Sequence, residues 1–273
     1  MEYGELIRQA LAEDRGRGDA TSTAVVRSGQ RARGVVLAKS ALVVAGLDVA
    51  TAVFRECDPQ AIVEVLWGDG SHVQANEPIA FVTGDARALL EAERTALNFL
   101  QRLCGVATLT SKYVGAAGGR ITILDTRKTT PGLRALEKYA VRCGGGTNHR
   151  SRLDEAILIK DNHKRIAGGI RPAADRALRG AQGLTVEIEV ENLQELDDAL
   201  QAGVSRILLD NFTTYDIREA VTRTAGRAVL EISGGVTLDR IPELATTGAD
   251  SVSIGALTHS APASDLSFEL EPA

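Results

Sequence analysis

Aromatic side chains are scarce in this sequence. Five Phe, four Tyr and one Trp are spread over 273 residues. Such a chain has few rings on which nucleic-acid bases could stack. The formal net charge of −5 points the same way, because binding to a phosphate backbone usually requires a basic surface. We therefore expect no nucleic-acid partner.

Cysteines and long apolar runs are also few. Cys57, Cys104 and Cys143 are widely spaced and form no C-x-x-C motif, which predicts reduced thiols in a cytoplasmic protein. The four histidines do not stand at metal-ligand spacing from a cysteine or from one another, so we expect no structural zinc. No run approaches about 18 apolar residues, and the N-terminal segment does not resemble a signal peptide. We expect neither a membrane span nor secretion.

Positive charge is concentrated in one segment. Residues 127–165 contain ten basic and four acidic side chains. A solvated helix face would explain such a run, but residues 144–150, GGGTNHR, read as a flexible loop that ends in His149 and Arg150. Arginine forks suit carboxylates and phosphates, and lysine acts as a compact point charge. The segment therefore predicts a site for small anions.

The first third of the chain indicates a mixed α/β domain. A helical period begins at Leu6 and ends in a turn-rich stretch. Apolar or β-branched runs bounded by Gly, Asp and Asn predict strands at 34–45, 61–66 and 78–82. Leucines spaced for one buried face then predict a helix over residues 86–103.

From residue 121 onward, short apolar runs alternate with helix-compatible segments. The runs are 121–124, 156–159, 186–190, 206–209, 228–232 and 251–254, and two of the intervening helices are expected at 192–202 and 238–246. Gly203 and Gly248 stand where helices end. This alternation predicts a parallel sheet covered on both faces. About 155 residues are too few for the roughly 250 of an eightfold barrel, so we expect an incomplete, open α/β barrel.

Polar and small residues follow these strands at the same end. The set comprises Asp125, Arg127, Lys128, Lys160, Glu189, Asp210, Asn211, Ser233, Gly234, Gly235 and Gly255. Any one of them could be a solvated charge or a plain turn. In barrels, however, the carboxyl ends of the strands build the active site, so the set as a whole predicts one.

Two subsites can be assigned within that set. Ser233-Gly234-Gly235 and Gly255 offer free backbone N–H groups where helices begin, and such groups favour a phosphate. Glu189 and Asp210 either balance the charge of Lys160 or bind a divalent cation or sugar hydroxyls. Mg²⁺ typically takes one or two carboxylates together with substrate oxygens.

The chain resembles the quinolinate phosphoribosyltransferase family, also called carboxylating nicotinate-nucleotide pyrophosphorylase, in motifs that follow in order along nearly its whole length. These are LAEDRGRGDATS (11–22), ERTALNFLQRLCGVAT (93–108), DTRKTTPGLRALEKYAVRCGGGTNHR (125–150), LIKDNH (158–163), EIEVE (187–191), LLDNF (208–212), EISGG (231–235) and SIGALTHSAP (253–262). Two small departures from the family are Cys104, where Ser is frequent, and Ile232, where Ala is usual.

The resemblance implies a fold, a reaction and an assembly. An N-terminal α/β sandwich domain would span residues 1–104 and be completed by 260–273, and an incomplete α/β barrel with the active site would span 105–259. The reaction would join quinolinate and 5-phosphoribosyl-1-pyrophosphate, with Mg²⁺, to give nicotinate mononucleotide, pyrophosphate and CO₂ for NAD biosynthesis. The chain would form a homodimer, or a higher oligomer, whose active sites are shared across the interface.

The resemblance also implies roles for individual residues. Quinolinate would be bound by Arg127, His149, Arg150 and Lys160, with Arg94 from the neighbouring subunit. Phosphoribosyl pyrophosphate would be bound by Lys128, Glu189, Asp210, Ser233, Gly234, Gly235, Gly255 and His259. Catalysis would fall to Lys128, Lys160, Glu189 and Asp210, and the metal to Glu189 and Asp210.

Several alternatives remain open at this point. A Schiff-base aldolase would use Lys160 as its nucleophile. A molybdenum-linked relative would keep the fold but change the substrate, which the intact NHR and LIKDNH motifs disfavour. The chain could also bind anions without catalysis, or use Cys143 as a thiol nucleophile, although a cysteine is more often a packing residue.

Overall fold

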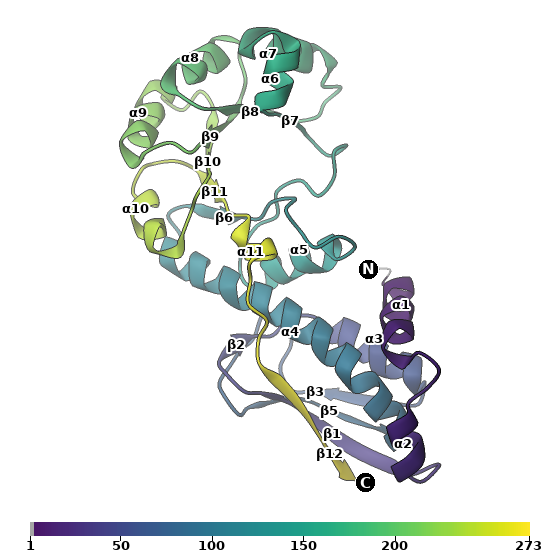
Figure 1. Cartoon of the computed structure of the whole chain (residues 1–273). Coiled ribbons are helices and arrows are strands. Elements are labelled where there is room, and N and C mark those ends of the chain that lie inside the picture. The colour runs from purple at the N-terminus through teal and green to yellow at the C-terminus, as the bar shows by residue number, and fades with distance from the viewer. Residues whose placement is uncertain (1–2) are drawn as a thin grey trace. The chain divides into compact units, whose positions relative to one another are not determined.

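The computed structural model describes residues 3–273, which form two compact units (Figure 1). The first contains the chain up to Ser111 together with Thr130–Gly145 and Thr258–Ala273. The second contains Lys112–Thr129 and Gly146–Leu257. Compared with the expected division, the segment 130–145 lies with the N-terminal domain and not with the barrel.

The first unit is built on an antiparallel sheet. Its strands are β1 (Arg31–Ala38), β2 (Leu42–Val43), β3 (Ile62–Val65), β4 (His72–Val73), β5 (Pro78–Asp85) and β12 (Leu266–Pro272), and its helices are α1 (Gly4–Arg15), α2 (Ala20–Val25), α3 (Leu47–Cys57), most of α4 (Ala86–Ala117) and α5 (Arg134–Cys143). The main sheet has the order β12-β1-β5-β3. The last strand of the chain thus pairs with the first, in a register that sets Val36 opposite Phe268. A side chain at Gly34 would overlap the Phe268 ring, so this close pairing depends on glycine.

The predicted strand over 34–45 is in fact two strands. β1 ends at Ala38, and β2 pairs separately with β4. The exposed polar residues Lys39 and Ser40 interrupt the apolar run, and the register of β1 against β5 already shifts between Val36 and Leu37. A strand that leaves its sheet at such an irregularity can join a second one.

The helix predicted over 86–103 continues to Ala117 and passes through the expected domain boundary after residue 104. The leucine period stops near Leu103 because smaller residues follow it. A side chain at Gly105 would overlap the backbone oxygen of Pro262, and Cys104 is fully buried beside Ala45, whose N–H lies 3.3 Å from the thiol sulfur. The small residues therefore allow close packing rather than end the helix.

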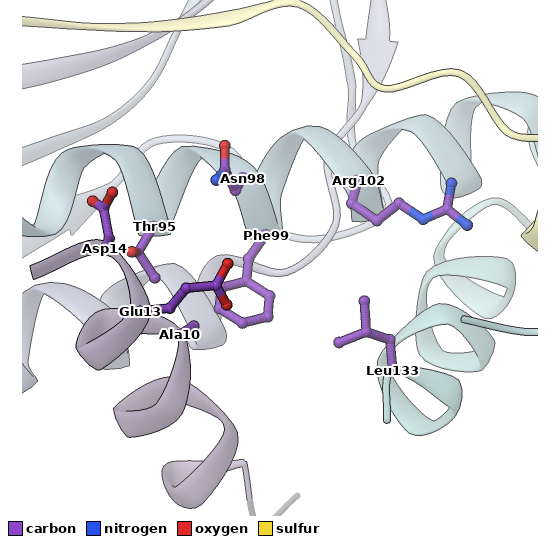
Figure 2. Close-up of a pocket in the computed structure, with 8 residues that line it drawn as sticks. All are labelled: Ala10, Glu13, Asp14, Thr95, Asn98, Phe99, Arg102 and Leu133. Carbon is purple, nitrogen blue, oxygen red and sulfur yellow. The ribbon is translucent and has the colours of Figure 1, made fainter. Parts of the chain in front are cut away.

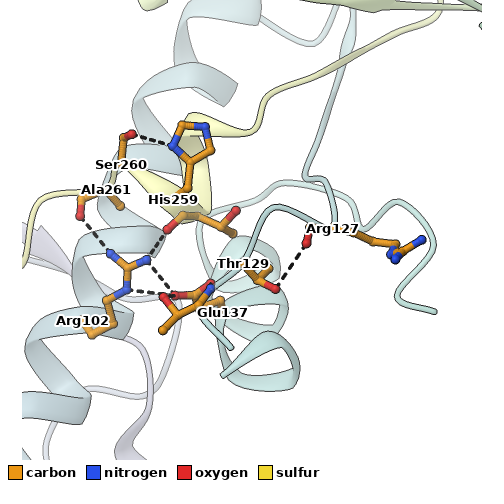
Figure 3. A network of polar contacts seen from close by, with 9 residues as sticks. Arg102, Arg127, Thr129, Glu137, His259, Ser260 and Ala261 are labelled. Atoms are coloured by element: carbon orange, nitrogen blue, oxygen red, sulfur yellow. Dashed lines mark hydrogen bonds and ion pairs between the residues drawn. The ribbon is translucent and has the colours of Figure 1, made fainter. Parts of the chain in front are cut away.

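An ion pair joins three segments of the first unit (Figure 3). Arg102 on α4 contacts Oε1 of Glu137 on α5, at 2.7 Å from Nη2, and its guanidinium also donates to the backbone oxygens of Thr258 and Ala261. Glu137 is fully buried and accepts hydrogen bonds from the N–H and hydroxyl of Thr130. These bonds place α5 with the first unit, and a buried ion pair of this kind is stable because its hydrogen-bonding groups are satisfied.

The second unit is a six-stranded parallel sheet with the order β6-β11-β10-β9-β8-β7 (Figure 1). The strands are β6 (Thr122–Leu124), β7 (Ile157–Ile159), β8 (Val186–Val190), β9 (Arg206–Asp210), β10 (Val229–Ser233) and β11 (Ser251–Ser253), and the helices are α6 (Asp161–Ala167), α7 (Ile170–Gly180), α8 (Leu193–Gln201), α9 (Thr214–Thr224), a 3₁₀ turn (Leu238–Arg240) with α10 (Ile241–Leu244), and the start of α11 (Ala256–His259). The six predicted strands are confirmed within two residues. The helix expected over 238–246 is instead a 3₁₀ turn followed by one short helix.

The barrel is open between β6 and β7, which form the two edges of the sheet. Thr147 forms an isolated parallel bridge with Leu124 of β6, and Nη1 of Arg150 donates to the backbone oxygen of Ala156, just before β7, at 2.7 Å. The segment 147–150 thus crosses the opening between the edges. Among residues 3–273, no helix is long and apolar enough to span a membrane.

Candidate active site

A cavity of about 360 Å³ lies at the carboxyl ends of the barrel strands. We call it the carboxyl-end cavity. It is lined by Thr126, Arg127, Lys128, His149, Arg150, Leu153, Leu158, Lys160, His163, Leu208, Glu231, Ser233 and Ser253. The parallel sheet brings these residues together because all its strands end at the same edge. The cavity therefore contains Arg127, Lys128 and Lys160, the three basic residues that the sequence placed at strand ends, together with Arg150 from the predicted 144–150 loop.

Arg127 and Arg150 form the positive wall of this cavity. Burial lowers the pKa of Arg150, and the charge of Arg127 lowers it further. The buried Nε of Arg150 has no hydrogen-bond partner within residues 3–273. Both arginines are partly buried, and two such guanidinium groups that repel each other favour an anion between or beside them, because an anion relieves their repulsion and supplies acceptors for their forks.

Lys160 stands at the end of β7, with its Nζ 3.7 Å from Oε2 of Glu189 on β8. Burial raises the pKa of Glu189, the nearby Lys160 lowers it, and Asp210 at the end of β9 raises it again. Glu189 and Asp210 are thus neighbouring carboxylates beside one cation. Lys160 is half-exposed and next to a carboxylate, unlike the apolar or cationic pocket that activates a Schiff-base lysine. The geometry disfavours the aldolase.

His149 is fixed by bonds within the second unit. Its backbone N–H donates to Oδ1 of Asp125 at 2.8 Å, and the amide of Asn148 donates to Oδ2 at 2.6 Å. Asp125 is fully buried at the end of β6. The sequence placed it among the strand-end site residues, and the structure shows it clamping the 148–149 backbone. The His149 ring points Nε2 at Glu187, 3.1 Å away.

Two glutamates lie inside the barrel below this cavity. Glu187 on β8 and Glu231 on β10 are 4% and 0% exposed, and the Arg206 guanidinium on β9 lies 3.9 Å from a carboxylate oxygen of each. Burial raises the pKa of Glu231 to about 7, with the charge of Glu187 adding to the rise and that of His149 opposing it. The barrel interior therefore contains charged side chains, and Glu231 keeps its proton to a higher pH than an exposed glutamate does.

The turn after β10 is a close approach of two backbones. Gly234 has φ +89°, and a side chain there would overlap the Asn211 amide. The N–H of Asn211 donates to the backbone oxygen of Ser233 at 2.9 Å. Only glycine fits at this position. Ser233 lines the cavity, Gly235 has φ +56°, and Gly255 comes two residues after β11 and directly before α11.

The remaining predicted residues lie elsewhere. Arg94 is exposed on α4, and His259 ends α11 with its Nδ1 2.6 Å from the Ser260 hydroxyl (Figure 3); both belong to the first unit. Cys143 also belongs to the first unit, and burial raises its pKa, which disfavours a thiolate nucleophile. Three basic residues of the charged segment, Arg134, Lys138 and Arg142, lie on α5 in the first unit and not in the barrel.

The first unit has a hollow of its own, of about 320 Å³, between α1 and α4 (Figure 2). Glu13 and Asp14 on α1 face it, together with Phe99 and Arg102 on α4. The Arg102 guanidinium is bound to Glu137 and to backbone oxygens. Two acidic side chains face this hollow, and the charge of Arg102 is already paired with Glu137, so the hollow is unsuitable for an anion. The carboxyl-end cavity is therefore the better candidate active site.

An open parallel barrel with paired arginines, a lysine and two carboxylates at its carboxyl end defines an enzyme of the α/β-barrel class that acts on small polyanions. Family models agree with this class in detail: residues 19–104 match the N-terminal domain of quinolinate phosphoribosyl transferase, and residues 106–269 match its C-terminal domain. The chain belongs to the quinolinate phosphoribosyl transferase family.

Individual relatives are similar over nearly the whole chain. The nicotinate-nucleotide pyrophosphorylase [carboxylating] of Mycobacterium leprae is 42% identical over 97% of this chain and 96% of its own length. The probable enzyme of the same name from Bacillus subtilis is 38% identical, covering 99% and 94%. The crystal structure of NadC from Streptococcus pyogenes superimposes with a TM-score of 0.96 at 40% identity, covering 100% of this chain and 97% of that one.

Sequence reasoning missed the interior residues Glu187, Arg206 and Glu231. The signal was present, since each stands at an inward-facing position of a strand predicted to be buried on both faces. A charged residue inside such a run requires a partner or a function.

Proposed function

We propose that the chain is a nicotinate-nucleotide pyrophosphorylase that acts in NAD biosynthesis. It joins quinolinate to the ribose of 5-phosphoribosyl-1-pyrophosphate and releases nicotinate mononucleotide, pyrophosphate and CO₂. Membership of the family and about 40% identity to carboxylating relatives over nearly the whole chain support this activity. The single observation that carries it in the fold is the partly buried pair Arg127 and Arg150 in the lining of the carboxyl-end cavity, which is suited to a small dicarboxylate.

The reaction needs no nucleophile from the protein. The ring nitrogen of quinolinate attacks C1 of the ribose, and the C1–O bond breaks with its electron pair leaving on pyrophosphate. The pyridinium ring then accepts the electron pair of the adjacent C–C bond as CO₂ departs, and a proton from solvent replaces the carboxylate. The protein positions and neutralises the two polyanions, in line with the basic lining of the cavity.

The proposed roles follow the positions of the side chains. Arg127 and Arg150 receive the quinolinate carboxylates, with Lys160 at the carboxyl end of β7. Lys128 and the turn at Ser233-Gly234-Gly235, with Gly255, receive the anionic end of the phosphoribosyl substrate. His149 lines the same cavity, but both of its ring nitrogens already have partners within the chain.

A magnesium ion is part of the proposal. Glu189 and Asp210 are the residues that would hold it, because Mg²⁺ prefers one or two carboxylates and completes its shell with substrate oxygens. The raised pKa of Glu189, to which Asp210 contributes, fits a carboxylate pair whose repulsion a cation would reduce. When bound, the ion would neutralise the departing pyrophosphate.

We further propose a homodimer in which Arg94 of one copy serves the cavity of the other. The exposure of Arg94 on α4 and its place in the first unit support this. His259, also in the first unit, would contact the phosphoribosyl substrate. A cytoplasmic location belongs to the same proposal, supported by the three free thiols.

Turnover is the first test. Incubation with quinolinate, phosphoribosyl pyrophosphate and Mg²⁺ should yield nicotinate mononucleotide, and no product over a range of pH and metal concentration would contradict the proposal. Arg94→Ala and Lys160→Ala should each be inactive. Mixing them after verified subunit exchange should restore part of the activity, because one of the two sites in a mixed dimer would be intact. Exchange without rescue would refute the shared site.

A further inference from the structure

The His149 ring is bound at both nitrogens by its own chain. The backbone N–H of Arg150 lies 2.8 Å from Nδ1, and Oε2 of Glu187 lies 3.1 Å from Nε2. A backbone N–H can only donate, so Nδ1 accepts and carries no proton. The ring proton is therefore on Nε2, where it is donated to Glu187, and the imidazole is the neutral Nε2–H tautomer.

The partner of this proton is itself held in place. Glu187 stands on the inner face of β8, with Arg206 of β9 beside it and Glu231 of β10 beyond. Oε2 of Glu231 lies 3.6 Å from the same Nε2. Ser251 of β11 lies in register with Glu231, but its hydroxyl and both carboxylate oxygens of Glu231 have no hydrogen-bond partner within residues 3–273. Oε1 of Glu187 has no hydrogen-bond partner within residues 3–273, so the orientation of this carboxylate rests on the ring N–H at Oε2 and on the charge of Arg206.

His149, Glu187 and Glu231 could in principle hold a metal ion, because their donor atoms lie within 4.8 Å of one another. The Arg206 guanidinium, 3.9 Å from each carboxylate, already supplies positive charge there. The hydrogen bond from Arg150 to Nδ1 also leaves Nε2 as the proton-bearing nitrogen. The cluster is therefore better suited to fixing a ring than to binding a cation.

We propose that Glu187, supported by Glu231 and Arg206, is a positioning residue that fixes the tautomer of His149 and, through it, the backbone of Arg150. If Nδ1 carried the proton, it would face the N–H of Arg150 donor to donor, and the start of the 150–153 segment would have to move. The Arg150 guanidinium would then leave its place beside Arg127. That this arginine receives a quinolinate carboxylate rests on the proposed function.

The tautomer can be measured directly. With four histidines in the chain, ring-¹⁵N labelling of the full-length protein and assignment with His149→Gln should give one resolved pair of ring nitrogens. In the substrate-free protein we expect a protonated Nε2 and a bare Nδ1. Glu187→Gln keeps an acceptor oxygen and should preserve this state, whereas Glu187→Leu should mix the tautomers. Glu243→Gln, an exposed glutamate on α10, is the matched control.

Kinetics separate positioning from general instability. Loss of a hydrogen bond that orients a charged group corresponds to about a tenfold effect, so Glu187→Leu should raise KM for quinolinate by about tenfold and leave KM for phosphoribosyl pyrophosphate within about twofold. Glu187→Gln should recover most of the difference. Equal changes in both KM values, or an unchanged KM for quinolinate in a Leu variant with mixed tautomers, would overturn the proposal.

Two outcomes need no folded variant. A proton on Nδ1 in the wild-type protein would overturn the proposal even if Glu187→Leu did not fold. A stoichiometric metal ion bound to His149 in the purified wild-type protein would do the same. Because the tautomer measurement uses no substrate, a failure of the proposed function would show as absent turnover with the expected tautomer intact.

Discussion

Replacement of Glu231 with Gln should change how the stability of the protein depends on pH. In the folded protein this carboxyl group is fully buried between Glu187 and β11, and its pKa rises from 4.5 to about 7. The folded state therefore binds more protons than the unfolded state between these values. The free energy of unfolding must fall as the pH rises through that window.

The size of the effect follows from the shift. A rise from 4.5 to about 7 corresponds to about 3 kcal/mol of stability lost between pH 4.5 and 7, with a slope near 1.4 kcal/mol per pH unit in the middle. Glu231→Gln has no proton to lose, so its stability should exceed that of the wild type by an amount that grows with pH.

Denaturant unfolding at pH 5, 6, 7 and 8 would measure this difference. The free energy of unfolding of Glu231→Gln minus that of the wild type should increase by about 3 kcal/mol between pH 5 and 8. The exposed Glu243→Gln should follow the wild type at every pH. Parallel curves for Glu231→Gln and the wild type, within about 0.5 kcal/mol, would refute the idea that Glu231 holds a proton in the folded barrel.

Three other substitutions test separate parts of the structure. Arg102→Met leaves Glu137 buried without its counter-ion and should lower the free energy of unfolding by about 3 kcal/mol, measured by thermal or denaturant unfolding. Adding Glu137→Leu to the same chain should recover part of this loss. Equal stability of Arg102→Met and the wild type would contradict the role of the pair. Gly234→Ala places a methyl group on the Asn211 amide at positive φ and should lower stability by about 2 kcal/mol; a stable, active variant would contradict the close approach. Arg150→Lys keeps the charge but loses the fork, so KM for quinolinate should rise about tenfold, and an unchanged KM would count against carboxylate binding there.

The barrel strands could be predicted closely because their environment is uniform. Val186–Val190 is buried along its whole length, so its apolar residues and its ends are visible in the sequence. Arg206–Asp210 is buried at its three central residues, and its prediction missed only the final aspartate. Because parallel strands end together, order along the chain was enough to place Arg127 and Lys160 around one cavity.

Predictions failed where tertiary contacts decide local structure. No local sequence pattern indicates that Gly105 packs against the backbone of Pro262. The predicted helix therefore ended at residue 103, whereas α4 continues to Ala117. Likewise, α5 carries part of the basic segment, but its place is determined by Glu137 and Arg102 from a distant part of the chain. Contacts between distant residues of this kind leave no periodic signal.

The sequence predicted which residues lie at the site better than it predicted the role of each one. Asp125 was grouped with the ligand-binding residues because it follows a strand, yet it accepts two hydrogen bonds from the Asn148–His149 segment and is inaccessible. A position at a strand end predicts that a residue lies near the site. Only its hydrogen-bond partners show whether it is free to contact the substrate or instead holds the pocket in shape.

The pairing of β12 with β1 has a consequence for synthesis of the chain on the ribosome. The first unit needs β12 as well as β1, so its sheet stays unfinished until residues 266–272 have been synthesised. The barrel strands, which all lie between residues 122 and 253, are available earlier. Throughout that interval β1 presents an unpaired edge, and such an edge is open to pairing with other nascent chains. β12 therefore completes the sheet after all the barrel strands have been made, and removal of residues 266–272 should make newly made chains aggregate before it impairs any catalytic group.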